Sequence, residues 1–255
     1  MNRLRELLPP VVAAVIGFGG WEMLLWLTRP DGFVLPPPSE IAGAVAENST
    51  AIQTATKVTG FIVVTGLLAG VLAGIAAALL VTAFRTANET LTPLAVAVNA
   101  IPIVALAPIF NAWFGLLSPR SNQAVVVALV FFPIFINTSR GLVDVEPSQI
   151  ELMESYGAGK WRIIREVRLP NAMPFFFTAL KLATSLAVIA AIVAEYFGGR
   201  QDALGNIITN SAGLTRYADA WAAVLAGSLM GIALYGSAVL LERITMPWYF
   251  LGRRA

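Results

Sequence analysis

Long apolar stretches separated by short polar segments recur along the whole chain. A helix needs roughly 20 mostly apolar residues to cross about 30 Å of hydrocarbon. Six stretches meet this requirement, at 9–27, 58–83, 91–115, 122–139, 174–196 and 219–241. The pattern predicts an all-α integral membrane protein with six transmembrane helices.

Composition supports the membrane class and narrows the chemistry. Hydrophobic residues make up 57% of the chain and charged residues only 13%, with a net charge of +2. There is no histidine and no cysteine, which excludes a disulfide framework, a thiolate zinc site, a histidine base and a cysteine nucleophile. We therefore expect a non-enzyme with no catalytic residue, no metal site and no nucleic-acid partner. Arg3 and Arg5 precede the first apolar run as in a signal peptide, but Glu22 and the lack of an A-x-A site favour a retained helix.

The distribution of basic residues predicts the orientation. With the N-terminus in the cytoplasm, the cytoplasmic side holds Arg3, Arg5, Arg85, Arg140, Lys160, Arg162, Arg165, Arg168, Arg243, Arg253 and Arg254. The outer side holds Arg29, Lys57, Arg120, Arg200 and Arg216. Positively charged loops favour the cytoplasm, so we expect a multi-pass protein of the inner or plasma membrane with both termini cytoplasmic.

A charged, amphipathic segment between the fourth and fifth stretches stands out, and we call residues 147–170 the island. Ser148 and Glu151 have the spacing of a capping box, and Gly157 and Gly159 permit a turn. A second helix follows, with an Arg162–Glu166 pair, and Leu169-Pro170 is expected to end it. The resulting apolar ridge suits docking in the groove of another protein. An interfacial helix lying on anionic lipid is the alternative.

The island does not bind ATP through a phosphate-binding loop. GAGK at 157–160 imitates the end of such a loop, but Glu154 and Trp161 stand where glycine and a hydroxyl residue are required. Energy for any transport must therefore come from a partner protein or an ion gradient.

The island resembles the EAA loop of ABC-importer permeases. The resemblance rests on the spacing of Glu151, Gly157, Val167, Leu169 and Pro170, and the chain departs from it at 152–153, where Leu and Met replace the usual alanines. The pair Trp21-Glu22, the stretch LPPPSE and NAIPIVALAPIFNAWFG (99–115) are similar to the nitrate, sulfonate, taurine and pyrimidine-precursor branch of these permeases.

The resemblance implies the permease subunit of a type I ABC importer for a small polar solute. It implies an N-terminal helix and outer amphipathic segment at 1–50, a permease domain at 51–246 and a cytoplasmic tail at 247–255. The implied partners are cytoplasmic ABC ATPase subunits, a second identical or related permease subunit and an extracytoplasmic substrate-binding protein. The chain itself would hold no cofactor, since ATP and Mg²⁺ would bind the ATPases. The implied coupling residues are Glu151, Gly157, Ala158, Trp161, Leu169 and Pro170.

Polar groups and prolines at membrane depth need neighbouring helices or water to satisfy them. They are candidates for the wall of a translocation path, or else static kinks satisfied by packing. The candidates are Asn99, Pro102, Asn111, Asn137 and Glu195. Glu22 and Glu195 are expected to pair with polar groups or line the outer mouth, and Lys181 is expected to extend its amine to the headgroups.

Two further patterns lead to expectations about helix packing and about contact with a binding protein. Gly66, Gly70 and Gly74, and likewise Gly227 and Gly231, repeat at G-x-x-x-G spacing. Such faces favour close helix packing within the subunit, with a seam between subunits as the alternative. The outer charges Arg200, Asp202, Arg216 and Asp219 are candidates for contact with a binding protein, or a solvated loop.

An ion-coupled secondary transporter with Glu22 or Glu195 as the ion site is the main alternative function. A membrane scaffold that recruits a cytoplasmic protein is another. The solute itself is not readable from the sequence.

Overall fold

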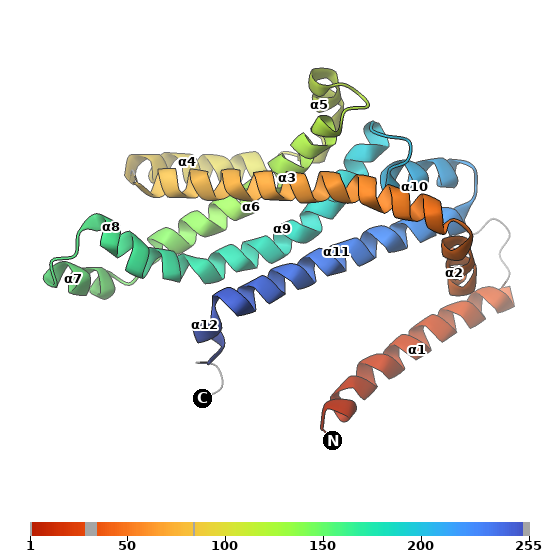
Figure 1. Cartoon of the computed structure of the whole chain (residues 1–255), viewed down its shortest axis with the longest axis horizontal. Coiled ribbons are helices and arrows are strands. Elements are labelled where there is room, and N and C mark those ends of the chain that lie inside the picture. Colours follow the sequence, from red (N-terminus) through yellow and green to blue (C-terminus); the bar gives the residue numbers. More distant parts are fainter. Residues whose placement is uncertain (1, 29–34, 84, 252–255) are drawn as a thin grey trace.

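A computed structural model describes residues 2–28, 35–83 and 85–251 of the chain (Figure 1). Arg29, Arg253 and Arg254, and residues 252–255 of the expected tail, lie outside the described residues. Within these limits the structure is helical, and we detect no strand. Its elements are α1 (Asn2–Thr28), α2 (Pro38–Glu47), α3 (Ser49–Ala83), α4 (Arg85–Asn99), η1 (Ile103–Leu106), α5 (Ala107–Phe114), α6 (Pro119–Val143), α7 (Pro147–Ser155), α8 (Lys160–Ile163), η2 (Ile164–Arg168), α9 (Leu169–Phe197), α10 (Leu204–Gly213), α11 (Tyr217–Thr245) and α12 (Pro247–Leu251).

Five of the expected spans are continuous helices. In the described part of the chain, the helices long and apolar enough to cross a membrane are Val11–Thr28, Ser49–Ala83, Pro119–Val143, Lys160–Phe197 and Tyr217–Thr245. Three of them begin well before the expected spans: α1 starts at Asn2, α3 at Ser49 and the helical path into α9 at Lys160.

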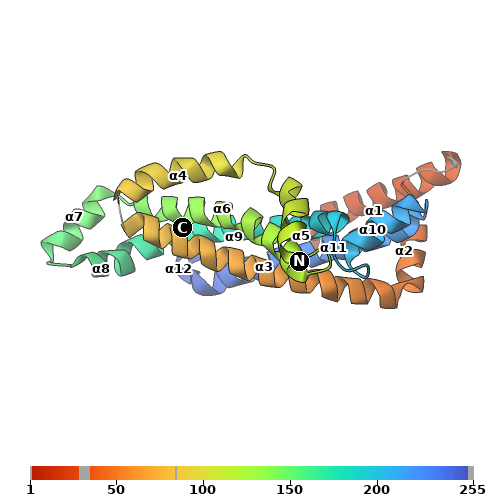
Figure 2. The ribbon, with the colours of Figure 1, turned by 90° about the horizontal axis from the view of Figure 1, so that it is seen from above.

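The expected third span, 91–115, is not one helix. It divides into α4, the short η1 and α5. The break follows Asn99, since Pro102 lacks a backbone donor and disfavours helix at Ile101. In Figure 2, α4 lies beside α6, and a connecting segment leads on to α5 near the other end of α6. A prediction of one continuous helix from hydropathy alone was therefore wrong here.

The core is built around α6, which packs between α3 and α9. Glycines make the α3 contact possible: a Cβ on Gly66 would lie 2.7 Å from Val126, and one on Gly70 would lie 2.8 Å from Val130. Gly74 meets Ile134 at the same separation, 2.8 Å. Since real Cβ atoms do not approach so closely, only glycine permits this spacing. Gly227 likewise faces Ile192 of α9, so both glycine motifs serve packing within the subunit.

The first helix stands outside this core. Leu25 is the one buried residue between 11 and 28, and α1 lies apart from α11 in Figure 1. The helix contacts α2, where the Glu22 carboxylate accepts hydrogen bonds from the Ser39 hydroxyl (2.6 Å) and backbone N–H (3.1 Å). The expected polar pairing of Glu22 is thus confirmed.

Lys181 forms an ion pair that joins α9 to α11. Its Nζ lies 2.9 Å from both carboxylate oxygens of Glu242. Sequence reasoning missed this partner because Glu242 falls beyond the apolar window assigned to the last span, and its alignment with Lys181 depends on helix packing. The extension of the amine toward the headgroups stays a prediction. A half-buried charge beside a buried carboxylate is stabilised by ion pairing rather than by water.

Breaking this pair by Glu242→Leu should lower the free energy of unfolding by about 3–5 kcal/mol, because it leaves the Lys181 charge unpaired. The double variant Lys181→Met/Glu242→Leu should recover most of that loss. Thermal unfolding of the purified protein in detergent measures both. Equal destabilisation in the single and double variants would show that packing at these positions, and not the ion pair, stabilises the contact.

Candidate functional site

The island consists of two helices joined at a glycine, as the sequence predicts. α7 ends at Ser155, and Gly157 follows with φ +74°, a left-handed conformation that favours glycine. The Gly157 N–H donates to the Glu154 carbonyl, and the Ala158 N–H donates to the Met153 carbonyl. These two bonds form a Schellman motif. Gly159 has φ −73° and needs no such freedom, so only Gly157 is required by the turn.

Ser148 and Glu151 do not form a capping box. Pro147 occupies the first turn of α7, which places Glu146 at the N-cap. Ser148 is therefore the second residue of the helix, and its hydroxyl donates a hydrogen bond to the Glu146 carboxylate. Glu151 is exposed and makes no cap bond.

Leu169-Pro170 does not end the second helix. α8 continues through η2, a π-helical turn over Ile164–Arg168, directly into α9. The wider turn precedes the proline, which lacks the N–H of an ordinary helix position. The island is therefore continuous with a membrane-length helix.

One surface of the island is exposed and aromatic. Tyr156 and Trp161 have exposed fractions of 76% and 74%, and Leu152 is also exposed. Leu169 is exposed as well, whereas Ala158 and Pro170 are half-buried. Ile163 points into the protein and is buried. The Arg162–Glu166 ion pair (3.1 Å) forms as predicted.

The base of the island is tied to the end of α6. Asn171 donates from Nδ2 to the carbonyls of Gly141 and Asp144, both at 2.8 Å, and Arg168 donates to the carbonyl of Leu142 at 3.3 Å. These carbonyls are among the acceptors that a helix end leaves unpaired. A Cβ on Gly141 would lie 2.7 Å from the Cα of Ala172. The island is thus attached closely to α6 as well as to α9.

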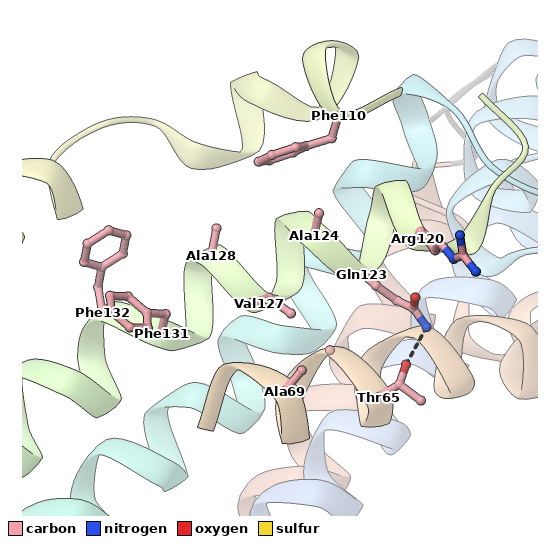
Figure 3. A pocket seen from close by; sticks show the side chains of 11 residues that line it. Thr65, Ala69, Phe110, Arg120, Gln123, Ala124, Val127, Ala128, Phe131 and Phe132 are labelled. Carbon is pink, nitrogen blue, oxygen red and sulfur yellow. Dashed lines mark hydrogen bonds between the residues drawn. The ribbon is translucent and has the colours of Figure 1, made fainter. Parts of the chain in front are cut away.

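A groove of about 720 Å³ opens on the same helix α6, between α3 and α5 (Figure 3). Ala124 and Ala128 point into the space, and Phe110 faces them from α5. Its lining also includes Ala69, Val127, Phe131 and Phe132. Because the alanine side chains are small, they leave the groove open, and the phenyl rings border it.

The groove has a polar end near the start of α6. Gln123 donates from Nε2 to the Thr65 hydroxyl at 2.7 Å, which bridges α6 and α3, and Arg120 lies one turn away. Lys57, Phe61 and Thr65 recur at four-residue spacing on α3 and so share one face of that helix. A second hollow of about 320 Å³, lined by Lys57, Phe61 and Arg200, lies along this face.

The predicted path residues do not line this groove. Asn99 and Pro102 are exposed near the break in the third span. Asn111 is buried, where it accepts from the Ser121 hydroxyl and donates to the Phe197 carbonyl. Asn137 donates to the Pro133 carbonyl of its own helix. These two amides therefore satisfy local backbone and packing needs, and a role of the five candidates in transport stays a prediction.

Glu195, the fifth candidate, is fully buried where three helices meet. Its carboxylate accepts from the Thr59 hydroxyl (2.9 Å) and from the Gly205 N–H (2.8 Å). The Leu204 N–H in turn donates to the Thr59 oxygen at 3.0 Å. This cluster holds the start of α10 against α3 and α9, which confirms the expected polar pairing of Glu195.

The four outer charges form two ion pairs within the chain. Arg200 binds Asp202 through two hydrogen bonds of 2.8 and 2.6 Å, and Arg216 binds Asp219, which also accepts from Asn48. The Arg200 guanidinium lowers the pKa of Asp202, so this pair persists at neutral pH. Contact of these residues with a binding protein stays a prediction.

Sequence reasoning missed the groove residues Thr65, Arg120, Gln123 and Phe131. Gln123 carried a signal, because an uncharged amide near the start of an apolar span needs a partner. The partner, Thr65, lies 58 residues earlier, and only the packing of α3 on α6 brings the two together.

Comparisons with known proteins are consistent with this architecture. Residues 66–249 match the family described as "Binding-protein-dependent transport system inner membrane component". The chain is 34% identical over 231 residues to the riboflavin transport system permease protein RibX of Chloroflexus aurantiacus, covering 89% of this chain and 85% of the relative. It is 32% identical over 249 residues to the formylaminopyrimidine transport permease protein ThiX of Halalkalibacterium halodurans (97% and 98% covered). It is 24% identical over 252 residues to the putative aliphatic sulfonates transport permease protein SsuC of Bacillus subtilis (95% and 86% covered).

Gly157→Val should loosen the island, because a β-branched residue at φ +74° costs about 1–2 kcal/mol. Gly159→Val is the matched control, since its backbone at φ −73°, ψ 163° suits valine. In membranes, trypsin should cleave at Lys160 and Arg162 about tenfold faster in the first variant. Equal cleavage of the two variants would contradict a structural role for the left-handed turn.

Proposed function

Because the chain belongs to the inner-membrane components of binding-protein-dependent transport systems and is an ABC-importer permease, we propose that α6 couples a cytoplasmic ATPase to a solute path. In this proposal the island receives the movement of the ATPase, and the groove forms this subunit's wall of the path. The third span crosses the membrane as the broken helix α4–η1–α5, which completes six spans.

One observation supports the proposal most directly: α6 contacts the island at one end and lines the groove at the other. Its last carbonyls are bound by Arg168 of the island and by Asn171, which follows it in α9, and its first half lines the groove through Gln123, Ala124 and Ala128. A rigid helix transmits displacement along its length, so a push on the island shifts the groove wall relative to α3. Irregular backbone at membrane depth is tolerated where it lines a cavity, and the break between α4 and α5 lies close to the groove.

The proposal assigns the partners as follows. ATP and Mg²⁺ bind the cytoplasmic ATPase subunits, and the exposed island surface with Tyr156 and Trp161 inserts into a groove of those subunits. A second permease subunit, identical or related, closes the path opposite the groove. A soluble binding protein delivers the solute to the outer end, near Arg200 and Arg216. Both chain termini then lie in the cytoplasm.

Trp161→Ala should weaken association with the ATPase subunits by about tenfold or more, because exposed tryptophans at such interfaces are typical energetic hot spots. Trp113→Ala is the matched control: Trp113 is equally exposed (71%) and lies on α5. The measurement is the amount of ATPase that co-purifies with tagged permease after gentle solubilisation. Undiminished ATPase with the Trp161 variant would remove the docking role from the island.

Single cysteines test the path, and the chain offers a background free of cysteine. Ala124→Cys and Ala128→Cys should react with a membrane-impermeant cationic thiol reagent about tenfold faster than Leu229→Cys, because reaction needs water and the thiolate. Leu229 is the control, exposed on α11 away from the groove. The reaction is followed in membranes that hold the assembled transporter. Equal rates at all three positions would contradict a water-filled groove.

A further inference from the structure

The groove differs from a plain water-filled passage in the kind of side chains that border it. Phe110, Phe131 and Phe132 bring three phenyl rings to one hollow. Phe131 stands edge-on to Phe132, with ring centroids 5.1 Å apart, and stacks on Phe135 at 5.6 Å. Aromatic side chains favour flat rings in offset or edge-on packing. The volume, about 720 Å³, falls within the range of sites that enclose small organic ligands.

One carboxamide supplies the polar recognition. Gln123 uses one N–H on the Thr65 hydroxyl, which fixes the side chain and leaves the second N–H and the carbonyl oxygen as a donor–acceptor pair. A glutamine in this arrangement can bind the adjacent donor and acceptor atoms on the edge of a nitrogen heterocycle, as it does with adenine in DNA. The Thr65 bond thus acts to orient Gln123.

A small anion fits the groove poorly. Arg120 is its one cationic lining residue and lies at the exposed outer rim, while the inner lining is alanine, valine and phenylalanine. An anion moved past Arg120 would lose its water without gaining a compensating charge, which is costly. A neutral flat ring meets no such penalty and gains contact with the phenyl groups.

From these contacts we propose that the groove recognises a planar nitrogen heterocycle, with its ring packed against Phe110 and Phe131 and its donor–acceptor edge bound by Gln123. Gln123 is then the residue that determines solute specificity, and Thr65 positions it. The inference rests on the proposed function, since it requires that solute enter the groove. It adds a selective site within the path to the selection made by the binding protein.

Protection of a groove cysteine tests the proposal. The Ala128→Cys chain in the assembled transporter is labelled with the cationic thiol reagent, with riboflavin, cytosine or taurine as the probe. Riboflavin or cytosine, each added at about four times its Kd, should slow labelling about fivefold. Taurine should not slow it. Adding Gln123→Met should abolish this protection. Adding Thr65→Val, which removes the bond that orients Gln123 but keeps the carboxamide, should reduce the protection only in part.

Each other result has a distinct meaning. Equal loss of protection with Gln123→Met and Thr65→Val would show that the bond is only a brace between α3 and α6, and would overturn the inference. Protection by taurine alone would overturn it in favour of a solute that carries a sulfonate group. Labelling that no probe slows would overturn it while leaving the proposed path intact. Failure of Ala128→Cys to label at all would instead contradict the proposed path itself.

Discussion

Close approach of helix backbones around α6 is the contact on which the rest of the structure depends. Gly66, Gly70 and Gly74 let α3 lie directly against Val126, Val130 and Ile134, and Gly141 does the same for α9 at the other end. In lipid there is little hydrophobic gain from bringing two apolar helices together, so van der Waals contact at short range has to stabilise the pair. Any side chain at these positions would separate the helices and remove that contact.

The packing of α6 also connects two distant surfaces of the protein. At one end its unpaired carbonyls are satisfied by Arg168 and Asn171, and at the other its side chains face the groove. Because α8, η2 and α9 form one continuous helical path, the island is connected to the membrane helices by two rigid routes rather than by a flexible loop. A partner that moves the island therefore acts on α6 and α9 together.

Polar side chains inside the bundle follow a common rule: the described ones discussed above are paired across helices or with backbone. Glu195 joins α9 to α3 and α10, Lys181 joins α9 to Glu242 of α11, and Asn111 joins α5 to α6 and α9. These bonds compensate the cost of removing charge and amide groups from water. Gln123 differs from these residues, because its bond to Thr65 uses only part of the amide and the rest faces the groove.

The sequence by itself determined the membrane class, five continuous spans, the island and its glycine turn. Each of these depends on local properties: the length of an apolar run, the period of a helix, and the backbone conformation that Gly157 permits. The tertiary structure decided the Lys181–Glu242 pair, the groove, and which of the two prolines Pro102 and Pro170 interrupts its helix. These depend on which helices become neighbours, and the partners are 61 residues apart for the ion pair and 58 for Gln123 and Thr65. Sequence periodicity shows which face of a helix is apolar, but it does not show which other helix will face it.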